Sequence, residues 1–195
     1  MAQAIFVGLF VLFGSLQNVS YAQMANGYEY LLLATNRTST MQKEMQEAAN
    51  LGYAFTGVMG GETTYGGSEV VVVMKRSQEA AARFEYRLLA TTKTSTMQDE
   101  LQAAGNSGFI YKGQTVFETT FGGVEAVVIL ERDKQAIRTD MFEYRLLATK
   151  RTSTMQEELR QAGTDGFEFV GVTIHPTTFG GDEMVAIMRR PVVSR

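Results

Sequence analysis

One six-residue phrase occurs three times in this chain of 195 residues. It reads RTSTMQ at 37–42, KTSTMQ at 93–98 and RTSTMQ at 151–156. Each copy follows an aromatic-Glu-Tyr sequence, and these sequences begin at residues 28, 84 and 142. Without gaps, residues 84–132 and 142–190 agree at about 30 of 49 positions. Such a period indicates that the chain folds as a series of similar small units.

Each unit carries the same succession of patterns. The segment FEYRLLAT (84–91) alternates between apolar and polar residues, which is typical of a half-buried strand. In the next segment Met97, Leu101 and Ala104 form an apolar helical stripe, and Gly108 ends the helix. Two further strands follow, and alternation in the first of them, from residue 109, predicts that Gly113 faces the helix.

The predicted fold class is therefore α+β. It consists of three tandem β-α-β-β repeats, each a three-stranded antiparallel sheet with one helix on one face. The predicted boundaries are 23–78 for unit 1, 83–134 for unit 2 and 141–193 for unit 3.

The first 22 residues predict a secretory signal peptide. An apolar run of about 13 residues, Ala4–Leu16, is shorter than the roughly 20 that a membrane span needs. Small residues at Ser20 and Ala22 suit cleavage after Ala22. We expect a periplasmic or secreted protein with no membrane span after cleavage. An uncleaved anchor and a buried core segment are the alternatives.

A unit of about 50 residues is too small for a sufficient core of its own. Its last strand, for example EAVVILE (125–131), is apolar on both faces. The free sheet faces are therefore expected to pack against each other or against another chain. The residues predicted for this seam, on the face away from the helix, are Leu33, Leu89 and Leu147.

Composition argues against several functions. The net charge of −3 gives no basic footprint for nucleic acid, and the chain has no cysteine. The single histidine, His175, is expected in a surface loop, and several of the 11 methionines, those in the helical stripe or the apolar last strand, are read as core filler. No metal or cofactor is expected. Glu85 and Glu143 are interpreted as exposed charge partners of Arg87 and Arg145, so we expect that the protein is not an enzyme. A pair of catalytic carboxylates, as in a glycosidase, is the open alternative.

The repeated phrase has two interpretations. Ser39 precedes Gln42 by three residues, as in the S-x-x-Q capping box of a helix start, with Thr40 as an alternative cap. The basic residue before it has no role in a cap, and a cation beside free backbone N–H groups suits an anion. The candidate ligand-binding residues are Arg37, Ser39, Thr40, Lys93, Ser95, Thr96, Arg151, Ser153 and Thr154.

A second phrase, ETTYGG, ETTFGG or PTTFGG, precedes the last strand of each unit. It is typical of a hairpin loop in which Gly-Gly supplies positive φ and the aromatic residue anchors the loop. If exposed, the three aromatic residues are candidates for contact with a sugar or a partner strand. They are Tyr65, Phe121 and Phe179.

The succession Y-E-Y, a helix ending in Gly-aromatic, a glycine-containing hairpin and a V-x-x-x-[KR] strand resembles the bacterial domain-of-unknown-function 4177 family. The resemblance covers about 50 residues in each of three copies. Family members usually carry Gly-Trp-Glu after the helix, whereas this chain has Tyr53, Phe109 or Phe167 and no Trp. The resemblance implies a fold and no particular activity.

From the sequence we expect an exported, non-catalytic interaction module of the cell envelope or extracellular space. Its partner would be another protein or a second copy, bound through the free sheet faces. The alternative is a protein that binds a small anion or an acidic sugar at the three [RK]TSTMQ helix starts. An enzyme of unknown class is the third possibility.

Overall fold

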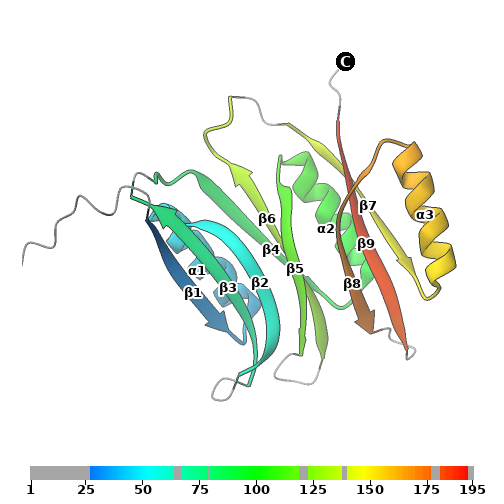
Figure 1. Cartoon of the computed structure of the whole chain (residues 1–195), viewed down its shortest axis with the longest axis horizontal. Coiled ribbons are helices and arrows are strands. Elements are labelled where there is room, and N and C mark those ends of the chain that lie inside the picture. The colour runs from blue at the N-terminus through cyan, green and yellow to red at the C-terminus, as the bar shows by residue number, and fades with distance from the viewer. Residues whose placement is uncertain are drawn as a thin grey trace, which may run out of the picture.

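The computed structural model describes residues 27–63, 67–78, 80–118, 123–137, 140–176 and 181–192. The order β-α-β-β occurs three times along the chain (Figure 1), which confirms the predicted α+β class with repeated units. The predicted signal peptide lies outside the described residues. The elements are β1 (Tyr28–Thr35), α1 (Thr38–Asn50), β2 (Ala54–Thr63), β3 (Gly67–Ser77), β4 (Phe84–Thr91), α2 (Thr94–Asn106), β5 (Ile110–Glu118), β6 (Val124–Asp133), β7 (Phe142–Thr149), α3 (Thr152–Thr164), β8 (Glu168–Pro176) and β9 (Asp182–Pro191).

The last strand of each unit is the central strand of its sheet. The strand orders are β1-β3-β2, β4-β6-β5 and β7-β9-β8, and all described pairings are antiparallel. A central strand has neighbours on both edges, and in the second unit both of its faces are buried as well, from Ala126 to Glu131. In β3, by contrast, buried residues alternate with half-buried ones. The first sheet therefore has one open face.

The helices follow the predicted stripes. Met41 and Met45 in α1, like Met97 and Leu101 in α2, are buried, which confirms that these methionines fill the core. Each helix is followed by a glycine with positive φ, at Gly52 (89°), Gly108 (77°) and Gly166 (83°). Other residues adopt this conformation only with strain, so glycine is needed where the chain leaves the helix.

The three units lie side by side in a row, with β1 at one end and α3 at the other (Figure 1). The first two cores are each completed by the unit that follows. The first core includes Tyr86, Val127 and Ile129 of unit 2, and the second includes Tyr144 and Ile187 of unit 3. The third core, made of unit 3 alone, has the fewest buried residues. Packing between units thus offsets the small size of each unit.

The prediction for the seam between units was wrong, because Leu33, Leu89 and Leu147 lie on the strand face toward their own helix. Leu89 packs with Met97 and Leu101 of its own helix, and Leu147 packs with Met155. Leu33 likewise lies against the core of its own unit. Alternation separates the two faces of a strand but does not tell which one the following helix covers. The face that meets the preceding unit belongs instead to Phe84, Tyr86, Leu88 and Ala90.

The predicted direction of Gly113 was also wrong. The register shifts between Tyr111 and Gly113, where an extra residue forms a β-bulge. The bulge puts residues 111 and 113 on opposite faces, although two residues apart normally share a face. A Cβ on Gly113 would lie 3.1 Å from the ring of Phe55, so the close approach is to the preceding unit rather than to the helix.

Candidate functional site

The joint between neighbouring units begins with glutamines that cover a strand edge. In β4, the backbone N–H groups of Tyr86 and Leu88 donate to Gln46 Oε1 and Gln42 Oε1 of α1, both at 3.0 Å. At the second joint the glutamines are Gln98 and Gln102, and their partners are Leu146 N–H (2.7 Å) and Tyr144 N–H (3.0 Å). Because β4 and β7 are edge strands, the glutamines satisfy backbone groups that no strand pairs.

These contacts correct the capping-box interpretation. The structure places the N-caps at Arg37, Lys93 and Arg151, none of them with a side-chain capping hydrogen bond. Ser39 and its counterparts Ser95 and Ser153 therefore lie inside the helices, one residue after the first. In the first two units the glutamine of the phrase does not reach back to its own helix start, because it bonds the strand of the next unit.

A buried tyrosine forms the centre of each joint. The hydroxyl of Tyr86 accepts from Phe55 N–H (2.7 Å) and donates to Glu131 Oε2 (2.6 Å). The hydroxyl of Tyr144 accepts from Tyr111 N–H (2.8 Å) and donates to the Phe109 carbonyl oxygen (3.1 Å). Phe55 and Tyr111 both lie at the β-bulge of their strand. The bulge therefore supplies a backbone donor that a tyrosine of the next unit can satisfy.

Burial raises the pKa of both Tyr86 and Tyr144, since it disfavours the phenolate. The folded protein therefore holds these protons above pH 10, where an unfolded tyrosine loses its own. Stability is fully present below about pH 10 and is lost as the pH rises further. Above pH 10 we expect Tyr86 to lower the free energy of unfolding by up to about 1.4 kcal/mol per pH unit, and Tyr86→Phe to show a correspondingly shallower fall. Urea unfolding between pH 9 and pH 11 measures this, and equal slopes in parent and variant would contradict it.

A second prediction uses the glutamines. Gln98→Ala removes the bond from Leu146 N–H and the bond that Gln98 Nε2 donates to the Tyr144 carbonyl oxygen (2.9 Å). It should lower the free energy of unfolding by about 1–2 kcal/mol, because two backbone groups lose their partners. Gln156 has the same place in α3 but is exposed, so Gln156→Ala should stay within about 0.5 kcal/mol. Urea unfolding of dilute protein measures both, and equal losses would show that the joint contact is not the cause.

The two ends of the row present the same surfaces, and no described unit covers them. We call the outer side of the first sheet the leading face; it comprises Tyr28, Tyr30, Leu32, Gly57 and Met59. The four large side chains of this face are 58–64 % exposed, whereas Tyr86 and Tyr144, which correspond to Tyr30, are 4 % and 2 % exposed. The N–H groups of Tyr30 and Leu32 have no glutamine partner among the described residues.

The opposite end is the trailing face, formed by α3 and one side of β8. It comprises Gln156, Arg160, Gly163, Phe169, Val172 and Ile174. Phe169, Val172 and Ile174 are 55–62 % exposed. Phe169 corresponds to Phe55 and Val172 to Val58, both of which contact Gly113 of the next unit. Among the described residues, no further unit covers this side.

The predicted anion residues are distributed over the three units and do not converge on one site. Arg37, Lys93 and Arg151 are exposed, one at the start of each helix. The backbone N–H of each donates to the threonine hydroxyl two residues earlier, at 3.1–3.3 Å. The second set of candidates, Tyr65, Phe121 and Phe179, lies outside the described residues. His175 is in strand β8, not in a loop, and its side chain is likewise not described.

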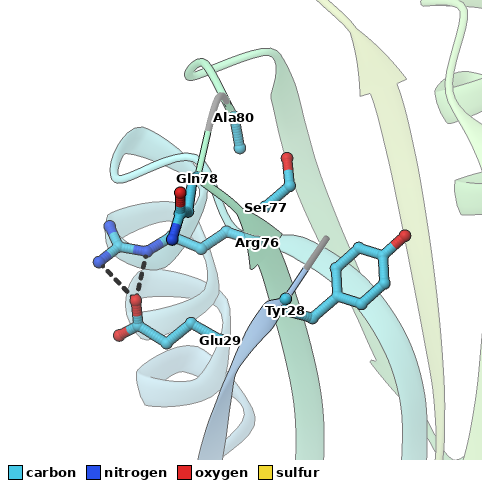
Figure 2. A pocket seen from close by; sticks show the side chains of 7 residues that line it. Tyr28, Glu29, Arg76, Ser77, Gln78 and Ala80 are labelled. Carbon is cyan, nitrogen blue, oxygen red and sulfur yellow. Dashed lines mark hydrogen bonds and ion pairs between the residues drawn. The ribbon is translucent and has the colours of Figure 1, made fainter. Parts of the chain in front are cut away.

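A pocket lies where β1 begins and β3 ends (Figure 2). Arg76 Nε donates to Glu29 Oε2 (2.9 Å), and Arg76 Nη1 donates to the Leu51 carbonyl oxygen at the end of α1 (3.1 Å). The Tyr53 hydroxyl also donates to Glu29. The hydrogen bond from Tyr53, and after it the one from Arg76, lowers the pKa of the Glu29 carboxyl. The pocket is lined by Gly27, Tyr28, Glu29, Arg76, Ser77, Gln78 and Ala80.

The Glu–Arg pair recurs in the other units, which indicates a structural role. Glu85 pairs with Arg132, and Glu143 pairs with Arg190, each directly across the ladder. The expected partners Arg87 and Arg145 were therefore wrong, because the strand neighbour lies closer than a residue two places along. Each arginine also donates to the carbonyl that ends its helix, so strand and helix are fastened together three times.

The fold defines a class: a short array of α+β repeats, whose two end faces no described unit covers. Comparisons with protein-family models, curated proteins and solved structures found no match to this chain. The resemblance to the domain-of-unknown-function 4177 family stays a prediction. Among the described residues, no group of three His, Asp or Glu side chains could hold a metal ion. No helix in this part of the chain has the length and apolarity to cross a bilayer.

Proposed function

We propose that this protein is an exported, non-catalytic interaction module of the cell envelope or extracellular space, and that it binds protein through its end faces. One observation carries the proposal. The leading face exposes Tyr28, Tyr30, Leu32 and Met59 on a sheet surface whose counterparts in units 2 and 3 are covered by protein. Apolar side chains gathered on one face mark an interaction site more often than scattered ones.

The pocket chemistry is consistent with a non-catalytic role. Glu29 and Arg76 bind each other, Arg76 also binds the Leu51 carbonyl oxygen, and the same Glu–Arg pair is repeated in the other two units. The export part of the proposal rests on residues 1–22. Mass spectrometry of the protein recovered from its producing cell tests it, with Gln23 expected as the first residue.

Site-specific photo-crosslinking in the producing cell tests the binding surface. A benzophenone amino acid replaces Leu32 on the leading face, and a matched variant carries it at Glu118, an exposed residue at the end of β5. We expect adducts of discrete mass from position 32 and none from position 118. Equal crosslinking from both positions, or none from position 32, would refute the proposed binding surface.

Anion binding is a second candidate because all three described helices begin without a side-chain cap and with Arg37, Lys93 or Arg151 at the N-cap. Phosphate and sulfate are suitable probes. A ligand that binds only the folded state adds about 2.7 kcal/mol at 100 times its Kd. A thermal shift that is lost in the triple variant Arg37→Ala, Lys93→Ala, Arg151→Ala would favour this candidate, and no shift would discard it.

A further inference from the structure

The large apolar side chains that are exposed in the described part of the chain concentrate at the two ends of the row. Of eleven such residues, seven belong to the leading and trailing faces. Repeat arrays normally carry polar outer faces on their terminal units, because a free repeat surface is otherwise a binding surface. Both described ends of this chain instead expose several large apolar side chains.

The two faces are also complementary, because each internal joint consists of one surface of each kind. At the first joint, the trailing side of unit 1 (α1, Phe55 and Val58) covers the leading side of unit 2 (Tyr86, Leu88 and Gly113). At the second joint unit 2 covers unit 3 in the same way. The trailing face of unit 3 and the leading face of unit 1 are the two halves of a third such joint.

We infer that the partner of these end faces is a second copy of this chain, bound head to tail. This inference rests on the proposed function and names its partner. In that joint Tyr30 of one copy occupies the position of Tyr144, beside α3 of the other copy. Its hydroxyl then meets the Phe169 N–H at the β-bulge of β8, and Gln156 meets the Leu32 N–H.

Two glycines fit this arrangement. Gly105 of α2 is buried against Tyr144, and a Cβ there would lie 2.8 Å from the tyrosine ring. Gly163 has the same place in α3, is exposed and has nothing within 4 Å of the position of a Cβ. It leaves room for Tyr30 of a second copy. Gly57, also open, receives the Phe169 ring as Gly113 receives that of Phe55.

Of the two hydrogen-bonding side chains on the trailing face, Gln156 and Arg160, the second differs from its counterparts. Arg160 replaces Gln46 and Gln102, so it cannot accept a hydrogen bond from the Tyr30 N–H. It can donate to the Tyr28 carbonyl oxygen, as Gln102 Nε2 donates to that of Phe142 (3.2 Å). A head-to-tail contact uses two different surfaces, so successive copies close into a ring or continue as a filament.

Mass measurement on the full chain, as the expressing cell processes it, tests this inference. Leu32→Glu blocks the leading face and Phe169→Glu blocks the trailing face; Ile137→Glu, a fully exposed residue between units 2 and 3, is the control. The parent and the control should assemble at micromolar concentration, and each blocked variant alone should be a monomer. An equal mixture of the two blocked variants should give dimers and nothing larger, because one intact face of each kind remains.

Several outcomes would overturn the inference. A parent that stays monomeric at 100 µM excludes it, as does assembly that Leu32→Glu abolishes and Phe169→Glu leaves intact. A mixture that stays monomeric while the parent assembles excludes it as well. Leu32→Ser and Phe169→Ser repeat the experiment if a glutamate variant does not fold, which circular dichroism shows.

The crosslinking experiment separates this inference from the proposed function. Adducts from position 32 to a peptide of α3 or β8 of another copy support both. Adducts to a different protein, with a monomeric parent, reject self-assembly and leave the interaction module. Adducts confined to residues 1–26 of the same chain would mean that this segment covers the leading face, and they reject both.

Discussion

Tyr144→Ala is expected to lower the free energy of unfolding by about 3–5 kcal/mol, the range for removing a buried aromatic side chain. The ring is 2 % exposed and lies between units 2 and 3. Its loss also leaves the Tyr111 N–H without the hydroxyl that accepts from it. Urea unfolding followed by circular dichroism measures the change.

Tyr30→Ala is the matched control, because Tyr30 has the same place in β1 and is 62 % exposed. At nanomolar concentration, where copies stay apart, it should change the free energy of unfolding by less than about 0.5 kcal/mol. Comparable losses in the two variants would mean that Tyr30 is covered in the monomer. The description of an open leading face would then be wrong.

Gly105→Ala and Gly163→Ala are expected to act in opposite directions. A Cβ on Gly105 would clash with the Phe142 carbonyl oxygen, a backbone atom that cannot rotate away. Overpacking of this kind lowers the free energy of unfolding by about 1–3 kcal/mol. Gly163 has open space around it, and replacing a glycine inside a helix by alanine raises stability by about 0.5–1 kcal/mol.

Thermal unfolding of dilute protein measures both changes. The midpoint of Gly105→Ala should lie below that of the parent, and the midpoint of Gly163→Ala should lie above it. The first joint carries Ala49, which is fully buried, where the second has Gly105. If Gly105→Ala raised the midpoint, the second joint would have shifted to accept the methyl group as the first one does, and close packing at Gly105 would not be required.

Most of the fold could be predicted from the sequence of the repeated unit. Alternation in FEYRLLAT, the stripe of Met97, Leu101 and Ala104, and the helix-ending Gly108 depend on local geometry, so they are readable without any partner. They predicted the β-α-β-β units, and the apolar last strand predicted that neighbouring units would pack together. Methionines in the helical stripe were likewise correctly assigned to the core.

The site was only partly predictable. Free sheet faces were expected to bind, but Leu33, Leu89 and Leu147 were chosen instead of Tyr30 and Leu32. The glutamines of the joint were missed, although a signal was present: Gln42 and Gln98 are each followed four residues later by another glutamine, whereas Gln156 is followed by Arg160. The change falls in the third unit, whose helix meets no following strand among the described residues.

The sequence by itself determined the elements, their order and the number of units, because short-range periodicity and turn chemistry act within each unit. The tertiary structure alone decided which face of each strand meets a neighbour. A one-residue bulge turns Gly113 to the face of the sheet opposite the helix. The helix packs on the strand face that carries Leu89, so the other face meets the neighbouring unit. The tertiary structure also decided that identical residues differ in environment, with Tyr144 buried and Tyr30 exposed, because burial depends on the neighbouring unit and not on the repeat.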